Sequence, residues 1–383
     1  MAETLLETPL GPKDLRRRHT SRDSPLRAWS AADELLLAAI GTTDPGRLLI
    51  VNDAWGALSV GLDRWQPVVW SDSVLERAAI DANLARNGGS TIADRVVTGD
   101  RVPEGVFDTV VLVVPKSLAL LEWQCRGIAA VRGPSTRLLI GGMSRHVTRG
   151  VVESIEGVLG PLRWNPARRK ARVLEVEPAT GASSVPILDA TPAFVTDAGI
   201  VVHEAPGVFS AGHLDVGTGL LLDEIGEAMP SPGGGRVADL GCGNGIIAAT
   251  LGRQWPEASF DLIDVSDLSV RAAKATWQAN HADDAGRARF FVADGVPADA
   301  GPYDLIVTNP PFHQGHAEDR GLTDRLLQGA AVHLVEGGIV VVVAQRHREL
   351  HRRLRRWFGR VETVSAHPSH VVLVAALPRR AGG

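Results

Sequence analysis

The chain has 383 residues, which is the length of two ordinary domains, and 44% of them are hydrophobic, which is enough for buried cores. The formal net charge of −4 excludes the global positive field that many nucleic-acid-binding proteins carry. Cys125 and Cys242 are the only cysteines and form no CxxC pair, so we expect no disulfide framework, no metal and a cytoplasmic location. The densest aliphatic run, 338–344, is too short to cross a membrane, and we expect no membrane partner.

Short aliphatic runs alternate with longer helix-like stretches along the whole chain. Stretches 72–86 and 266–280, rich in Ala, Leu and Arg, are typical of the helices between such runs. This alternation predicts an α/β fold built from βαβ units around mostly parallel sheets. The expected strands are 47–51, 109–114, 137–140, 236–240, 259–263, 304–308 and 339–344.

The two halves of the chain carry similar strings. Stretch 56–62 aligns with 245–251, 77–79 with 271–273, and 107–108 with 303–304. The near-constant spacing of these matches indicates a duplicated domain. A segment dense in Pro, Gly, Ala and Ser, from about Pro178 to Pro192, has the composition of a linker. We therefore predict one domain over 1–178 and a second over 179–383.

A glycine loop follows the expected strand 236–240. It reads Asp239-Leu240-Gly241-Cys242-Gly243-Asn244-Gly245 and leads directly into a helix-like stretch. Ile246 stands where the dinucleotide fingerprint G-x-G-x-x-G requires its third glycine, so nicotinamide and flavin cofactors are disfavoured. About twenty residues beyond the loop, Asp264 follows the next strand, where a carboxylate can accept hydrogen bonds from the hydroxyls of a ribose.

This arrangement resembles the class I S-adenosylmethionine-dependent methyltransferases. The resemblance implies that the loop holds the methionine part of S-adenosylmethionine, that Asp264 holds the ribose, and that Asp294-Gly295 lies near the adenine. The cofactor-binding residues expected on this basis are Asp239, Gly241, Gly243, Asn244, Gly245, Asp264, Asp294, Gly295 and Asn309.

The expected strand 304–308 runs into Asn309-Pro310-Pro311-Phe312, followed by His313. Two prolines stiffen the turn and remove two N–H donors. An exocyclic amine is a weak nucleophile because its lone pair is delocalised. If Asn309 Oδ1 and the Pro310 carbonyl accept both of its N–H bonds, the lone pair is directed at the methyl donor, while Phe312 stacks on the base. Similar tetrads ending in Tyr or Trp occur in adenine-N6 and glutamine-N5 methyltransferases, so the tetrad predicts the reaction class and leaves the acceptor open.

The wider string 309–316 resembles the bacterial ribosomal RNA guanine-N2 methyltransferases, as do 207–210 and 214–217. Stretches 51–59 and 114–122 look most like the large-subunit enzyme. The resemblance covers about 45–383 and implies two tandem Rossmann-like class I methyltransferase folds, of which only the second is active. It also implies guanine in ribosomal RNA, or in a ribosomal subunit, as substrate. A small-subunit rRNA enzyme, a glutamine-N5 or adenine-N6 methyltransferase, and a non-catalytic RNA-binding pseudoenzyme stay open as alternatives.

The first half lacks the residues that such chemistry needs. Asn52 and Ala54 replace Gly241 and Gly243, Trp70 falls where Asp264 would be, and Val113 falls where Asn309 would be. We therefore expect a degenerate first domain that positions RNA. The expected substrate contacts are Phe312, His313, Arg346 and Arg348, the last two from an arginine cluster that can bind phosphates. Where the family has a lysine or arginine before the last strand, this chain has His367-Pro368-Ser369-His370.

Overall fold

A computed structural model describes residues 3–18, 25–178, 191–208, 212–228, 232–310, 317–346 and 350–379. The chain divides into two compact units, Met1–Asp189 and Ala190–Gly383. The expected α/β fold is confirmed, and each expected strand overlaps a strand of the structure. Within the described residues, no helix is both long enough and apolar enough to span a bilayer.

The first unit is built on a seven-stranded sheet with the order β5-β4-β3-β6-β7-β9-β8. Strands β3 to β7 run parallel, and β8 and β9 complete the sheet in antiparallel fashion. The strands are β3 (Leu48–Val51), β4 (Val68–Ser71), β5 (Val96–Thr98), β6 (Phe107–Val113), β7 (Arg132–Met143), β8 (Leu162–Trp164) and β9 (Ala171–Val176). A small β1 (Leu5–Leu6) and β2 (Lys13–Asp14) pair separately.

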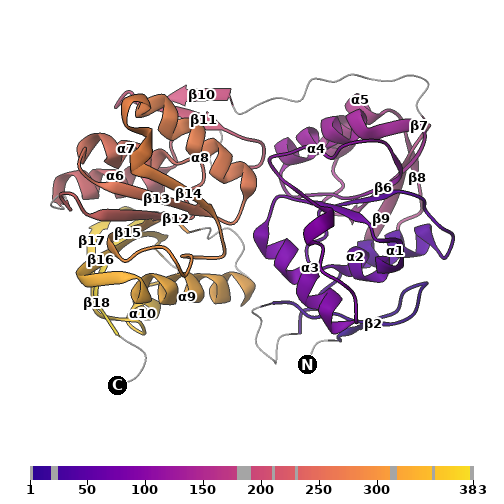
Figure 1. Cartoon of the computed structure of the whole chain (residues 1–383), viewed down its shortest axis with the longest axis horizontal. Coiled ribbons are helices and arrows are strands. Elements are labelled where there is room, and N and C mark those ends of the chain that lie inside the picture. The colour runs from indigo at the N-terminus through magenta and orange to yellow at the C-terminus, as the bar shows by residue number, and fades with distance from the viewer. Residues whose placement is uncertain are drawn as a thin grey trace. The chain divides into compact units, whose positions relative to one another are not determined.

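Helices cover both faces of this sheet (Figure 1). Helices α1 (Ala31–Ile40), α2 (Ala57–Gly61) and α3 (Val74–Arg86) pack on one face, and α4 (Leu118–Val131) and α5 (Arg149–Leu159) pack on the other. Because both faces are covered, the central strands are largely apolar, and every residue of β3 is buried. Short 3₁₀ turns, η1 (Asp63–Trp65) and η2 (Ala93–Arg95), precede β4 and β5.

The second unit repeats this sheet with the order β14-β13-β12-β15-β16-β18-β17. Its strands are β12 (Arg236–Leu240), β13 (Ser259–Asp264), β14 (Ala288–Val292), β15 (Tyr303–Thr308), β16 (Leu334–Gln345), β17 (Phe358–Ala366) and β18 (His370–Pro378). The strand orders of the two units correspond position by position, so the duplication predicted from short matches is confirmed. A hairpin of β10 (Thr191–Val195) and β11 (Val201–Glu204) precedes the sheet.

The helices of the second unit again form two layers (Figure 1). One layer holds α6 (Val216–Ala228), α7 (Ile246–Gln254) and α8 (Asp267–Asn280), and the other holds α9 (Ala317–Val332) and α10 (Leu350–Leu354). A 3₁₀ segment, η3 (Ala282–Arg287), follows α8. The chain goes from β12 to β13 and β14 on one side, then returns to β15 on the other. This reversal beside β12 creates the crevice in which such sheets bind ligands.

Candidate active site

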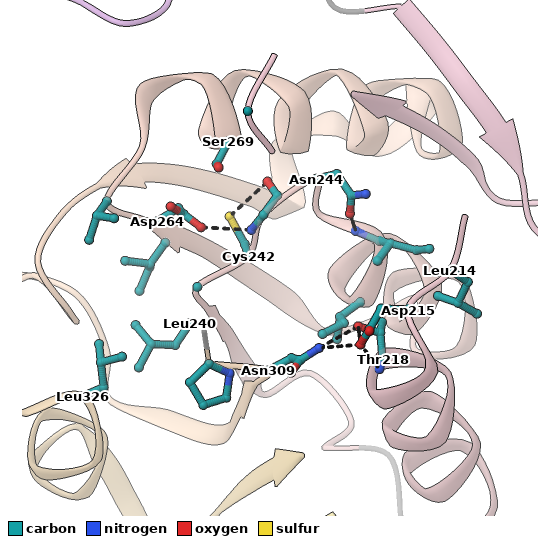
Figure 2. A pocket seen from close by; sticks show the side chains of 18 of the residues that line it. Leu214, Asp215, Thr218, Leu240, Cys242, Asn244, Asp264, Ser269, Asn309 and Leu326 are labelled. Atoms are coloured by element: carbon teal, nitrogen blue, oxygen red, sulfur yellow. Dashed lines mark hydrogen bonds between the residues drawn. The ribbon is translucent and has the colours of Figure 1, made fainter. Parts of the chain in front are cut away.

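A pocket opens at the carboxyl edge of the second sheet. Its walls come from the glycine loop after β12, the ends of β13 and β15, and the segment immediately before α6 (Figure 2). The pocket therefore lies in the crevice where the strand order reverses, which is the usual place of a ligand site in an open α/β sheet.

Three glycines of the loop have positive φ angles, which are +76° at Gly241, +53° at Gly243 and +76° at Gly245. A Cβ atom added to Gly241 or Gly243 would meet no protein atom within 4 Å, so these two residues leave pocket space open. A Cβ atom on Gly245 would lie 2.8 Å from Cα of Ala273, so this glycine instead lets α7 pack closely on α8. The loop thus offers a cradle for a ligand, and its third glycine has a packing role.

Asp264 lines the same pocket from the end of β13 (Figure 2). Its Oδ2 accepts a hydrogen bond from the Gly243 N–H, and its Oδ1 accepts one from the Ser266 N–H, both at 3.0 Å. Burial raises the pKa of this carboxyl. Each carboxylate oxygen can accept a second hydrogen bond, so Asp264 retains capacity for the hydroxyls of a ribose. The cradle and this acid together fit S-adenosylmethionine.

Two acids expected at the cofactor do not line the pocket. Asp239 is fully buried beneath the loop, where its Oδ2 accepts a hydrogen bond from the Ala248 N–H at 3.2 Å. Burial, together with the charge of Asp264, raises the pKa of Asp239 to about 7. Asp294 pairs with Arg325 at 3.3 Å. Direct contact of either acid with a cofactor stays a prediction, whereas Asn244 and Gly295 do line the pocket.

Asn309 and Pro310 stand at the end of β15 and line the pocket. The side-chain nitrogen of Asn309 donates to Oδ2 of Asp215 and to Oγ1 of Thr218, both at 3.0 Å (Figure 2). Asp215 and Thr218 were not expected as site residues. The only sequence signal was the position of Asp215 within the 214–217 stretch that resembles the family.

The remaining expected substrate residues are distributed as follows. Pro311, Phe312, His313 and Arg348 lie outside the described residues. Arg346 follows β16 and lines a small groove with Ser369 and His370, and His370 also lines the main pocket. His370, which belongs to the stretch where a lysine or arginine was expected, is thus beside the site. In the part of the chain that the structure describes, no three His, Cys, Asp or Glu residues are grouped so that they could hold a metal ion.

The strand register relates the two units and corrects one expected equivalence. Leu240 pairs with Ile263 and Val51 pairs with Trp70, so Trp70 corresponds to Ile263. The residue in the place of Asp264 is therefore Ser71, and Trp70 was wrong. The physical reason is a shorter connection, because 19 residues separate the paired positions in the first unit (70 − 51) and 23 in the second (263 − 240). Val113 does take the place of Asn309.

The corresponding loop of the first unit has different residues at two of its positions. Asn52, with a φ of 64°, takes the place of Gly241. The next residue, Asp53, is buried and accepts hydrogen bonds from the N–H groups of Gly56 at 3.1 Å and Ser59 at 2.7 Å. Ser59 occupies the helix position that Ala248 occupies in the second unit. A carboxylate of the chain therefore caps the helix from within the loop, at a site where the second unit has Cys242.

Comparisons with known proteins agree with this geometry. The RLMG N-terminal domain family matches residues 3–180, and the methyltransferase small domain family matches residues 199–374. A Pseudomonas syringae pv. syringae protein named ribosomal RNA large subunit methyltransferase G is 35% identical, covering 97% of this chain and 99% of its own length. A protein of the same name from Streptomyces griseus is 36% identical, with coverages of 96% and 98%.

A solved structure also matches both units together. It is a T. thermophilus 16S rRNA N2 G methyltransferase in complex with AdoMet and guanosine. The TM-score is 0.76 at 25% identity, and the match covers 98% of this chain and 97% of that one. The tandem class I methyltransferase fold implied by the sequence is thereby confirmed.

Proposed function

Because this chain belongs to the ribosomal RNA large subunit methyltransferase G family, we propose that it methylates the exocyclic N2 amine of a guanine in 23S ribosomal RNA. The observation that carries this proposal is that Asn309 and Pro310, whose side-chain amide and backbone carbonyl can accept N–H bonds, line the same pocket as the glycine cradle. Ribosomal RNA is made and modified in the bacterial cytoplasm, and we place the reaction there.

The second unit holds the cofactor with residues whose geometry fits it. Gly241 and Gly243 provide the space for its methionine part, and Asp264 accepts hydrogen bonds from its ribose. S-adenosylmethionine, when bound, supplies a methyl group on a positively charged sulfur. Asp239 supports the loop from below by capping α7.

Asn309 and Pro310 act on the acceptor. Their two oxygens accept the two N–H bonds of the guanine amine, which draws the nitrogen toward a tetrahedral shape and frees its lone pair. This is catalysis by positioning, and no ionisable base is needed, because the extra proton leaves the product amine to water. We propose that Phe312 stacks on the base and that His313, Arg346 and Arg348 contact the RNA around it.

We further propose that 1–178 is a non-catalytic domain that positions RNA. The observations behind this are the replacement of Asn309 by Val113 and of Asp264 by Ser71, together with Asn52 in the place of Gly241. Exposed basic residues at the β8–β9 turn, among them Arg168 and Lys170, are available for phosphate contacts. Removing such charges should weaken RNA binding and lower its salt dependence, and an unchanged salt slope would count against this role.

The decisive experiment offers the purified enzyme several acceptors with labelled S-adenosylmethionine. Large and small ribosomal subunits, naked 23S and 16S rRNA, DNA and a release factor are tested in parallel, and labelled nucleosides are identified by mass spectrometry. We expect N2-methylguanosine at one position of 23S rRNA and none with Asn309→Ala. Label in 16S rRNA, in adenine or in glutamine would support the corresponding alternative enzyme. Absence of label with every acceptor would favour an RNA-binding pseudoenzyme.

A further inference from the structure

The side-chain nitrogen of Asn309 donates hydrogen bonds to two side chains at the start of α6, those of Asp215 and Thr218. Asp215 immediately precedes this helix, and its Oδ2 accepts a hydrogen bond from the Thr218 N–H at 3.1 Å. Thr218 is 6% exposed, and its Oγ1 lies 3.5 Å from the same Asp215 oxygen. The first turn of α6 therefore anchors both groups that receive the Asn309 nitrogen.

We propose that Asp215 and Thr218 are positioning residues that fix the Asn309 amide with its oxygen toward the substrate, so that the site selects an acceptor carrying N–H bonds. This inference deepens the proposed function and rests on it. The acceptor class that it implies is an exocyclic amine, and carbonyl oxygens and unprotonated ring nitrogens are excluded.

The hydrogen-bond donors of Asn309 determine how its amide is oriented. A side-chain amide has two N–H bonds, and Asn309 directs one at Asp215 and one at Thr218, each at 3.0 Å. An ionised carboxylate can only accept, so the nitrogen and not the oxygen of Asn309 must face Asp215. With both donors used, only Oδ1 is left for the substrate, and it can only accept.

The reverse orientation of the amide is disfavoured for the same reason. Rotating it by half a turn would place Oδ1 against the Asp215 carboxylate and remove the hydrogen bond to it, whereas the Thr218 hydroxyl could still donate to Oδ1. It would also present an N–H group to the substrate amine, where donor meets donor. Lysine, arginine or protonated histidine at 215 or 218 would favour the rotated amide, whereas the carboxylate of Asp215 opposes it.

Matched pairs of substitutions test the proposal. Thr218→Val is nearly isosteric and removes the hydroxyl, whereas Thr218→Ser keeps it. Asp215→Leu removes the acceptor. Asp215→Asn is its matched control, because the asparagine oxygen can still accept the hydrogen bond from the Thr218 N–H. The assay measures kcat and KM for 23S rRNA, the dissociation constant for S-adenosylmethionine by calorimetry, and the melting temperature.

We expect Thr218→Val to lower kcat roughly 10-fold and Asp215→Leu to lower it roughly 10- to 100-fold, the worth of one neutral and one charge-assisted hydrogen bond. KM for RNA and the affinity for S-adenosylmethionine should change little, and Thr218→Ser and Asp215→Asn should recover most of the activity. A purely structural role would instead shift the melting temperature and all kinetic constants together.

The outcomes distinguish a failure of the positioning role from a failure of the proposed function. If the wild-type enzyme does not methylate rRNA, the proposed function fails. If the wild type is active and Thr218→Val keeps its kcat, the positioning role is overturned. Should Thr218→Val fail to fold, the comparison of Asp215→Leu with Asp215→Asn decides, and equal kcat values in that pair would overturn the proposal.

Discussion

Alanine at Gly243 and alanine at Gly245 should damage the enzyme in different ways. Both residues have positive φ, so alanine costs about 1–2 kcal/mol of folding free energy at either position. At Gly245 the new Cβ also lies 2.8 Å from Cα of Ala273, and such overpacking costs a further 1–3 kcal/mol or so. The summed loss is about 2–5 kcal/mol for Gly245→Ala and about 1–2 kcal/mol for Gly243→Ala.

Cofactor binding should follow the opposite order. The Cβ of Gly243→Ala meets no protein atom within 4 Å and stands in the pocket, so it takes space that the ligand needs. We expect the dissociation constant for S-adenosylmethionine to rise about 5- to 150-fold, because overpacking by one methyl group typically costs about 1–3 kcal/mol. Urea unfolding and calorimetry measure the two quantities. A Gly243→Ala protein that binds S-adenosylmethionine as tightly as the wild type would refute this account of the loop.

Other substitutions test the framework around the site. The pKa of Asp239 is raised from 3.8 to about 7 in the folded protein, so its contribution makes the free energy of unfolding fall as pH rises between about 4 and 7. Asp239→Asn should remove that component from the pH profile of urea unfolding, and an unchanged slope would contradict the buried-acid reading. Arg169 and Lys170 have φ angles of 49° and 59° in a tight hairpin turn that favours Asn-Gly. Arg169→Asn combined with Lys170→Gly should therefore raise the free energy of unfolding by about 1 kcal/mol, seen as a higher melting temperature, and a decrease would show that the arginine and lysine themselves stabilise the turn. Asp261 is buried and receives hydrogen bonds from two arginines and a tyrosine, so Asp261→Ala should cost about 3–5 kcal/mol in urea unfolding, and a loss below about 1 kcal/mol would show that the network contributes little.

The strands and the cofactor loop could be predicted from the sequence because their signals are local. Strand 236–240 is a short apolar run, and the glycines after it carry dihedral requirements that few other residues meet. Asn309 and Pro310 were predictable for the same reason, since prolines restrict the chain wherever they occur.

Features that depend on distant residues could not be predicted. Asp215 lies 94 residues before Asn309, and no local pattern links the two. The misplaced equivalence of Trp70 had a similar origin, because short matches between the halves cannot show that one connection is four residues shorter. Strand register resolved it, since hydrogen-bonded pairing is a property of the folded sheet.

The residues that replace the cofactor-binding residues in the first unit have a consequence for how the two units respond to heat. A bound small molecule stabilises only the fold that binds it, by about 2.7 kcal/mol at one hundred times its dissociation constant. In the first unit Ser71 stands in the place of Asp264 and Val113 in the place of Asn309. We therefore expect that unit to bind no S-adenosylmethionine and to gain no stability from it. In melting curves recorded over a range of S-adenosylmethionine concentrations, the unfolding transition of the second unit should therefore move to higher temperature. The transition of the first unit should stay at the same temperature.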